Sequence, residues 1–370
     1  MALELSMYRK ITDDIRGAID YGTLKPGDKI PSVSALKGKY GVSHITALRV
    51  YKELSDLFYV QHKRGCGYFV RSNEEMKRPS FTGNIACFIR PLRTYTNTDN
   101  YLNDINLGIQ TEICNRHVNL FTSHTVMPLN RLPVSGASLE HIHDAMLAMA
   151  DNVDGYLVDE RIPDDMLQNI LRSTSKPMVI VNRLSKLPVD TVTPPNREGM
   201  FKGLDTAIRM GYSSFIYCNS GTAQSNPQER LAAFKSFVAD KNIADKQIVI
   251  VYGCDLNPLA ETRSSLEKGI KQLKKLGKIL IVTSSDPIGR DCLDWLPTQN
   301  LRPGKDIGVL STEGLGYINL KKPEMSSVLS KPEQMGAMAV DLLLQRISAE
   351  THADPQNYSP EAAFSFGETI

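Results

Sequence analysis

Residues 41–54, GVSHITALRVYKEL, decide the fold of the N-terminal part of the chain. Ser43 predicts a helix start, because a serine side chain can accept a hydrogen bond from the first turn. At 100° per residue, Ile45, Arg49 and Lys52 point away from the apolar side. That apolar side comprises Ala47, Val50, Tyr51 and Leu54. The stretch therefore predicts an amphipathic helix with a partly basic outer face, typical of a core helix or of a helix that contacts DNA.

Two further helices are predicted upstream. The first runs from about Ser6 to Tyr21, with Tyr8, Ile11, Ile15 and Ile19 on one side. After the turn YGTLKPGDKIPS, Ser32 can cap a short helix that stops at Gly41. Two short helices joined across a glycine turn form a helix-turn-helix, whose second member normally lies in the major groove of DNA.

A basic hairpin is predicted after these helices, in LFYVQHKRGCGYFV at 57–70. The runs FYVQ and GYFV favour strands, and His62, Lys63 and Arg64 then lie at the tip beside two glycines that permit positive φ. Such a hairpin is either a solvated turn or a wing that contacts phosphates or the minor groove.

Together, residues 6–71 resemble the winged helix-turn-helix of GntR-type bacterial regulators. The resemblance rests on Y..I...I..AI..G.L.PGD.IPS, the GVS turn, T....Y.EL and the G-x-G-Y-F-V wing. It implies DNA contacts from the second helix and the wing. Val33 and Ser34 stand where Glu-Arg often follows PS in this family, so the resemblance does not imply the usual phosphate or base contact of that arginine. We expect Lys37 or Lys39 to replace it in part. The predicted DNA-contacting residues are Ser32, Lys37, Ser43, His44, Thr46, Arg49, Lys63, Arg64, Gly65 and Gly67.

Charge divides the chain unevenly. Residues 1–78 carry 14 Lys/Arg against 9 Asp/Glu, a net charge of +5, and the remainder carries −3. A basic N-terminal part on a mildly acidic remainder suggests that only the former meets a polyanion. No apolar run approaches a membrane span, and the N-terminus lacks a signal-peptide pattern, so we expect a cytoplasmic protein without a membrane partner. Six scattered cysteines, with no CxxC pair, favour reduced thiols over disulfides or a metal site.

The segment 72–83 is polar and aperiodic, which predicts a linker between a head, residues 1–71, and a body, residues 84–370. In the body, apolar runs such as IACFIR, PMVIV and KILIVTSS alternate with amphipathic patterns such as DDMLQNILRST. Continuous apolar strands between helices predict parallel sheets covered on both faces. The length of the body predicts an α/β fold with two lobes and a ligand cleft between them.

The body resembles LacI/GalR-type effector domains, which have the periplasmic-binding-protein type I fold. The matching segments include VDGYLV, KPMVIVNR, ERLAAFKSFVADKNI, ILIVTSSD and VLSKPEQMGAMAVDLLLQRI. A GntR-type head on such a body is similar to the arabinose-responsive repressors of the AraR kind. The fold implies three crossovers between the lobes, which we expect near Arg183–Thr193, Ser311–Gly314 and Ser330–Pro332.

The resemblance also implies ligand contacts. Arg230 and Asp286 match family residues that bind sugar hydroxyls, and an arginine fork and a carboxylate both suit vicinal hydroxyls. The alternatives are a solvated arginine and a helix N-cap. In the first lobe we expect contacts from Asp99 and from Tyr101, whose ring can stack on a sugar. Asp159 and Asn196, at strand ends, are as consistent with loop capping as with ligand contact.

Catalytic motifs of the GxSxG, P-loop and HExxH types are absent from the sequence. His141 and His143 would point to different faces of their helix, which argues against a metal site. The sequence therefore predicts a ligand-responsive transcription regulator, by resemblance a repressor, that binds operator DNA as a homodimer. It also predicts a sugar-like effector, without a cofactor or metal. The alternative is a cytoplasmic sugar-binding or sugar-processing protein with the head as an adaptor.

Overall fold

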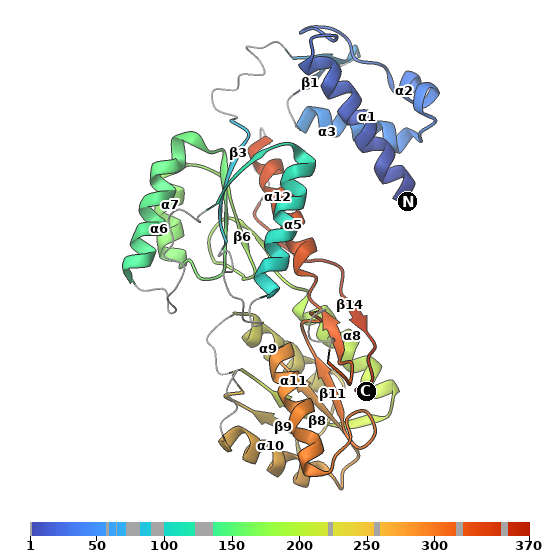
Figure 1. Cartoon of the computed structure of the whole chain (residues 1–370), viewed down its shortest axis with the longest axis vertical. Coiled ribbons are helices and arrows are strands. Elements are labelled where there is room, and N and C mark those ends of the chain that lie inside the picture. Colours follow the sequence, from blue (N-terminus) through green and yellow to red (C-terminus); the bar gives the residue numbers. More distant parts are fainter. Residues whose placement is uncertain are drawn as a thin grey trace.

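The computed structural model describes residues 2–56, 59–63, 65–71, 82–89, 100–122, 136–220, 225–254, 260–315, 321–348 and 354–370 (Figure 1). Its head contains the elements α1 (Ala2–Asp20), α2 (Val33–Tyr40), α3 (His44–Asp56), β1 (Val60–Lys63) and β2 (Gly67–Val70). Both predicted caps are present: Ser32 Oγ accepts from the Ala35 N–H at 3.2 Å, and Ser43 Oγ accepts from the Thr46 N–H at 3.1 Å. Gly41 ends α2 in the left-handed conformation with φ 65°, as a glycine C-cap does.

The hairpin pairs Val60 with Val70 and Lys63 with Gly67. Its first strand therefore starts two residues later than the predicted FYVQ, and His62 and Lys63 belong to the strand rather than to the tip. Gly65 and Gly67 have φ values of 76° and 105°, which explains both glycines, because other residues rarely adopt this conformation.

The apolar sides predicted for α1 and α3 meet in the core of the head, together with Leu36 of α2 and the two hairpin strands. Its buried side chains are Tyr8, Ile11, Ile15, Ile19, Ile30, Leu36, Ala47, Val50, Tyr51, Leu54, Val60 and Val70. Burial of this side leaves the opposite face of α3 in solvent.

The first lobe of the body is built on a parallel sheet with the strand order β13-β7-β6-β5-β3-β4. Its strands are β3 (Asn84–Phe88), β4 (Asn119–Thr122), β5 (Gly155–Val158), β6 (Met178–Val181), β7 (Asp190–Val192) and β13 (Asn357–Tyr358). Helices cover both faces, with α5 and α12 on one side and α6 and α7 on the other (Figure 1). These helices are α5 (Asn100–Arg116), α6 (Gly136–Met149), α7 (Asp164–Thr174) and α12 (Pro332–Ser348).

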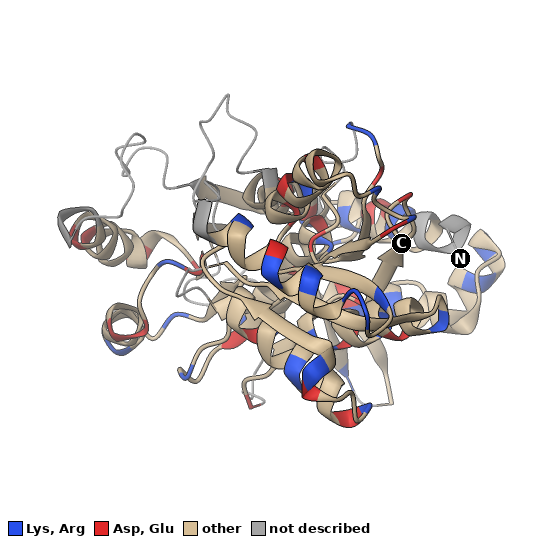
Figure 2. Ribbon diagram, turned by 90° about the horizontal axis from the view of Figure 1, so that it is seen from below, with Lys and Arg blue, Asp and Glu red and all other residues tan. Residues whose placement is uncertain are grey.

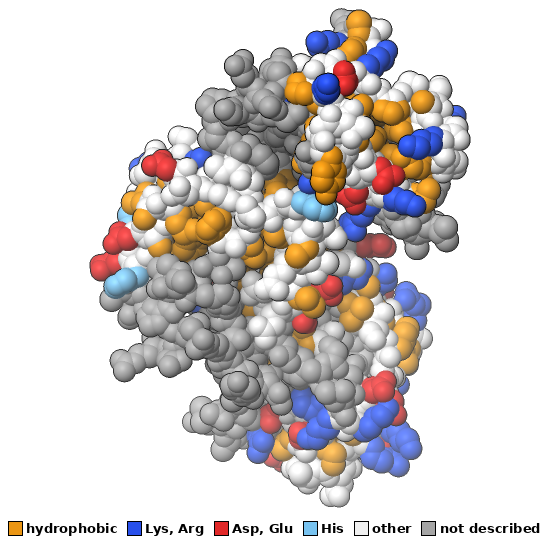
Figure 3. Space-filling view, turned by 45° about the horizontal axis from the view of Figure 1, so that its top comes forward, with side chains coloured by type: hydrophobic (Ala, Val, Ile, Leu, Met, Phe, Trp, Pro, Cys, Tyr) orange, Lys and Arg blue, Asp and Glu red, His pale blue; other side chains and the backbone are white. Residues whose placement is uncertain are grey.

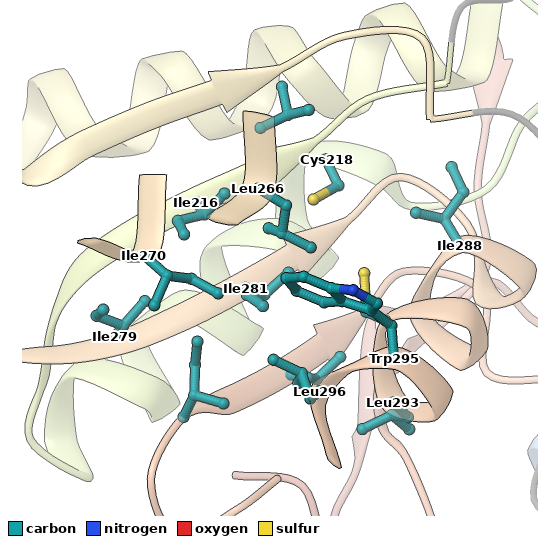
Figure 4. Packing of buried hydrophobic residues seen from close by; sticks show 14 of the residues in the cluster. Ile216, Cys218, Leu266, Ile270, Ile279, Ile281, Ile288, Leu293, Trp295 and Leu296 are labelled. Carbon is teal, nitrogen blue, oxygen red and sulfur yellow. The ribbon is translucent and has the colours of Figure 1, made fainter. Parts of the chain in front are cut away.

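The second lobe has the strand order β14-β12-β11-β10-β8-β9, parallel except for the antiparallel pair β12–β14. Its strands are β8 (Tyr212–Cys218), β9 (Ile248–Val251), β10 (Lys278–Thr283), β11 (Gly308–Ser311), β12 (Ser326–Leu329) and β14 (Ala363–Ser365). Its helices are α8 (Asn196–Arg209), α9 (Ser225–Asp240), α10 (Ala260–Leu273) and α11 (Asp286–Trp295). On one face of this sheet, Trp295 and Leu296 pack in a cluster with Ile281 and Leu266 (Figure 4).

The chain crosses between the lobes after β7, after β12 and after β13, at residues 193–196, 330–332 and 359–362. The predicted crossover at Ser330–Pro332 is confirmed. The one predicted at Ser311–Gly314 is wrong, because the chain goes on from β11 to β12 within the same sheet. The predicted crossover at Arg183–Thr193 overlaps the observed one at 193–196 only at Thr193.

Helices α5 and α12 approach each other closely through two glycines. A Cβ on Gly108 would lie 1.9 Å from the Glu333 carbonyl oxygen, and one on Gly336 would lie 2.1 Å from that of Ile105. Both obstacles are backbone atoms, so a side chain at either position forces the helices apart. The pair therefore fixes α12, the helix that follows the second crossover, against the first lobe.

We expect Gly336→Ala to lower the stability of the body by about 1–3 kcal/mol, the usual cost of overpacking. Thermal unfolding of the full chain measures this effect. Gly38→Ala in α2 is the matched control, because nothing lies within 4 Å of its Cβ position. There alanine should be neutral or stabilising by roughly 0.5–1 kcal/mol. Equal unfolding temperatures for the two variants would contradict the close packing of α5 on α12.

Candidate functional site

The outer face of α3 is open to solvent and partly cationic. His44, Arg49 and Lys52 are exposed on it. The Arg49 guanidinium lies over the Tyr8 ring, 4.2 Å from its centroid, a cation–π contact that orients the side chain without neutralising it. Thr46 differs from the prediction: it is only 8% exposed, and its hydroxyl lies 2.7 Å from Ser43 Oγ. Its side chain stabilises the helix start rather than projecting outward.

The hairpin and α2 add further cations beside this helix. Lys63 is exposed, with its ammonium 5.2 Å from the Phe69 ring centroid. Among the predicted DNA-contacting residues, Lys37, Ser32 and Gly65 are exposed, and Gly67 is half-buried. Arg64 lies outside the described residues. On the described part of the body, both Lys/Arg and Asp/Glu positions occur on the helices (Figure 2).

A second candidate site lies between the lobes, centred on Arg230 of α9. This residue is 3% exposed, so the alternative of a solvated arginine is excluded. Its Nε donates to Asn196 Oδ1 at 2.9 Å, and its Nη1 donates to the Ser284 carbonyl at 2.7 Å and to a Glu313 carboxylate oxygen at 3.1 Å. A buried guanidinium needs such a set of acceptors, because an unpaired charge in the interior is strongly unfavourable.

Asp286 is the first residue of α11 and is 1% exposed. Its carboxylate accepts from Ser311 Oγ at 2.5 Å and from the Leu315 N–H at 2.7 Å. Its own N–H donates to Glu313 at 3.0 Å. Burial, together with the nearby negative charge of Glu313, raises the pKa of Asp286 to about 6.

Glu313 is not among the predicted residues, yet it joins two of them. It follows β11 and contacts both Arg230 and the start of α11. Its position after a buried strand is the signal that could have identified it, since strand ends line the cleft in folds of this type.

A chain of amides extends the network into the first lobe. Asn196 Nδ2 donates to Asn226 Oδ1 at 3.0 Å, and Asn226 Nδ2 donates to Asn182 Oδ1 at 2.8 Å. Asn182, which follows β6, donates in turn to Glu160 at 3.1 Å. Arg230 is therefore connected to the strand ends of both lobes.

Tyr101 and Glu160 approach this network from the first lobe. Burial raises the pKa of the Tyr101 phenol. The charges of Glu313 and Glu160 raise this pKa too, whereas that of Arg230 lowers it. Asp159 is buried but pairs with Arg161, so that Glu160, the next residue, faces the network. Asp99 lies outside the described residues. The structure thus brings Asn196, Arg230 and Asp286 of the predicted ligand residues into one network. The Tyr101 hydroxyl donates to Met335 Sδ of α12 at 3.6 Å.

Several buried polar atoms near the network have no hydrogen-bond partner within the described part of the chain. They are Tyr217 Oη, Asn219 Oδ1, Ser225 Oγ and Glu229 Oε1. Asn219 follows β8, and Ser225 and Glu229 lie in the first turns of α9, the helix that carries Arg230. Such groups are costly when unsatisfied, so this part of the body suits a ligand with several hydroxyl or amide groups.

The described ranges contain no group of three or more His, Cys, Asp and Glu side chains placed to hold a metal ion. Nor does any helix among them have the length and apolar character that a membrane span requires.

Two family models match the chain. Residues 7–70 match the bacterial regulatory proteins of the gntR family, and residues 204–370 match the periplasmic binding protein-like domain. The head is thus a GntR-type winged helix-turn-helix, and the body has the predicted LacI-type α/β fold.

The mannosyl-D-glycerate transport/metabolism system repressor MngR of Escherichia coli is 38% identical over 65 residues, which are 18% of this chain and 27% of that protein. The HTH-type transcriptional regulator KdgR of Bacillus subtilis is 21% identical over 58% of this chain and 62% of its own length. The chain therefore spans less than two thirds of these relatives. Among solved structures, the transcriptional regulator CelR–cellobiose complex is similar with a TM-score of 0.62 and 17% identity, over 92% of this chain and 100% of that chain.

Proposed function

We propose that this chain, which joins a GntR-type head to a periplasmic-binding-protein-like body, is a cytoplasmic transcription regulator that binds operator DNA and a small-molecule effector. The observation that carries the proposal is the buried network around Arg230, because it connects the strand ends of both lobes in a chain whose head exposes a cationic helix face. By likeness to relatives that are named repressors, we propose repression as its action.

The DNA-binding part of the proposal assigns base contacts to the outer face of α3 and phosphate contacts to the flanking cations. His44 and Arg49 project from α3, while Lys37 and Lys63 lie on α2 and the hairpin. A homodimer would place two heads on a two-fold symmetric operator, with half-sites about 34–36 Å or a multiple of this distance apart. Isologous pairing through the body is the usual route to such symmetry.

The effector part of the proposal assigns the ligand to the interlobe network. Arg230 and Asn196 would donate to ligand oxygens, Asp286 and Glu313 would accept from hydroxyls, and Tyr101 would cover the ligand from the first lobe. The unpartnered polar atoms near α9 support a polyhydroxylated ligand. The similar CelR structure is a complex with cellobiose, which supports a sugar as the effector.

The division of the chain follows from the same proposal: a DNA-binding head at 1–71, a linker at 72–83 and an effector-binding, dimerising body at 84–370. In support, the head elements end at Val70 and the first body strand begins at Asn84. Residues 72–81, most of the linker, lie outside the described residues.

Titration of labelled duplex DNA from the protein's own promoter region tests the DNA part. We expect binding that weakens steeply with salt, because phosphate contacts release counterions. Arg49→Ala should lose specific affinity by about 1–3 kcal/mol, the value of a good base contact. Arg197→Ala, on α8 of the second lobe, is the control. Salt-insensitive binding that Arg49→Ala leaves unchanged would refute this part.

Thermal unfolding of the full chain against mono- and disaccharides, sugar acids, sugar phosphates and purines tests the effector part. A ligand at a hundred times its Kd should stabilise the body by about 2.7 kcal/mol. Mass spectrometry of the recovered compound then separates a regulator from a sugar-processing protein, since only the latter returns it altered. The curated relatives are transcription regulators by name, which favours an unaltered ligand.

A further inference from the structure

The outer face of α3 carries two exposed aliphatic side chains that the DNA contacts assigned above do not use. Ile45 is 78% exposed and Leu48 is 45% exposed. Among the large aliphatic side chains that the structure describes, Ile45 is the most exposed. The two lie three residues apart, so they are neighbours on one face of the helix. Single exposed aliphatic residues are common, but a pair on this face requires an explanation.

The surroundings of the pair are cationic. Arg49 and Lys52 are exposed on the same helix, and Lys37 and Lys39 are exposed on α2. The stretch from His44 to Lys52 contains no acidic residue. Figure 3 shows hydrophobic side chains beside Lys and Arg on the surface of the head. A cationic surround disfavours a second copy of the same face, since like charges repel, and favours a polyanion.

The position of the pair in the helix specifies which part of a duplex it would meet. Ile45 is the second residue of α3, and Leu48 lies one turn further on. In a helix-turn-helix, the N-terminal residues of the second helix contact base edges in the major groove. The apolar group exposed there is the 5-methyl group of thymine.

We propose that Ile45 and Leu48 recognise thymine 5-methyl groups in each operator half-site, so that part of the sequence specificity comes from hydrocarbon contacts. This inference rests on the proposed function of the head. Apart from Arg49, which is assigned a base contact above, the cations around the pair contact phosphates and contribute affinity without selecting a base, whereas the two aliphatic side chains select thymine. The methyl groups lie on neighbouring base pairs, because side chains three residues apart on a helix are separated by about 5–6 Å.

Replacement of single thymines by deoxyuridine in the bound duplex tests the proposal, because deoxyuridine lacks only the methyl group. We expect one or two positions per half-site at which wild-type affinity falls about fourfold, the effect of losing one buried methyl group. Ile45→Ala should bind the thymine duplex more weakly and no longer distinguish it from the deoxyuridine duplex at its position. Leu48→Ala should do the same at the neighbouring position.

Lys37→Ala is the matched control, and it should weaken binding to both duplexes equally. The Ile45→Ala and Leu48→Ala variants should both fold, since the replaced side chains are exposed and alanine favours a helix. Circular dichroism checks this. Wild-type protein that binds all deoxyuridine duplexes as tightly as the thymine duplex would overturn the inference while leaving the proposed function intact. Absence of any salt-sensitive binding would overturn both.

Discussion

Arg230→Met is expected to destabilise the body by about 3–5 kcal/mol, the cost of removing one partner of a buried ion pair. The guanidinium is the cation that faces Glu313, and Glu313 lies against Asp286. Without it, the buried carboxylate of Asp286 and the partly buried carboxylate of Glu313 remain close together with only hydrogen bonds to stabilise their charge. Methionine preserves the unbranched apolar stem, so lost packing contributes little. Urea unfolding of the full chain measures the change, and any effector that stabilises wild type should no longer do so.

The pH dependence of the free energy of unfolding provides a second measurement on the Arg230→Met variant. The pKa of Asp286 is raised to about 6 in the folded chain, above its unfolded value of about 3.9. Its contribution to stability is therefore fully present below about pH 4 and is lost as the pH rises through about 6. Loss of Arg230 should raise this pKa further, so that stability continues to fall toward neutral pH.

Arg197→Met is the matched control for this prediction. Arg197 lies on α8 of the same lobe, its side chain is about half exposed, and its ion pair with Asp240 spans 3.9 Å. We expect a change within about 0.5 kcal/mol, as for most surface substitutions. In the double variant Arg230→Met/Glu313→Gln, part of the lost stability should return, because one unpaired carboxylate has been removed. An Arg230→Met protein that unfolds at the wild-type urea concentration would contradict the importance of the network.

How far the sequence predicts this molecule depends on the length and periodicity of each segment. Long periodic segments are predicted well: the apolar sides of α1 and α3 are buried as expected, and DDMLQNILRST coincides with α7. The misplaced crossover has a physical cause in β12, whose residues SSVL lack a long apolar run. Strands β13 and β14 have two and three residues, too few to show a period, so the third crossover between them is not predicted.

At the candidate site, the sequence predicts the main residues but not all of their contacts. Arg230, Asp286, Asn196 and Tyr101 are expected on a family resemblance, and the structure brings the first three into one network. Local ion pairs decide which of two adjacent residues contacts the network. At the end of β5, Asp159 pairs with Arg161, and Glu160 instead accepts a hydrogen bond from Asn182 in the network. The hydrophobic and polar pattern of a sequence does not predict which side chains form such ion pairs. Glu313 is not predicted, because its segment is interpreted as a crossover.

The Arg116 guanidinium at the top of the first lobe is one of the groups that join the head to the body, beside the Arg9–Glu112 ion pair at 3.8 Å and the contact of Arg16 with His117 at 3.1 Å. Arg116, the last residue of α5, donates to Glu112 at 2.7 Å, to Asp341 of α12 at 2.5 Å and to Glu53 of α3 at 3.2 Å. Helix α12 starts at the second crossover, where Ser330 Oγ donates to the Glu313 carbonyl at 2.8 Å. A path of contacts therefore runs from the network around Arg230 along α12 to α3, the helix proposed to contact DNA. Figure 1 shows α12 beside α5 in the first lobe.

We expect Arg116→Met to bind DNA and effector but to lose most of the coupling between them. Effectors typically change the affinity for a second ligand by about 5–150-fold. In this variant that factor should approach one, because the ion pairs that connect Glu53 of α3 with Asp341 of α12 through Arg116 are lost. DNA titrations with and without effector measure it. Arg172→Met, an exposed arginine of α7 in the same lobe, should retain wild-type coupling. Full coupling in Arg116→Met would show that the signal reaches the head by another route, such as the linker at 72–83.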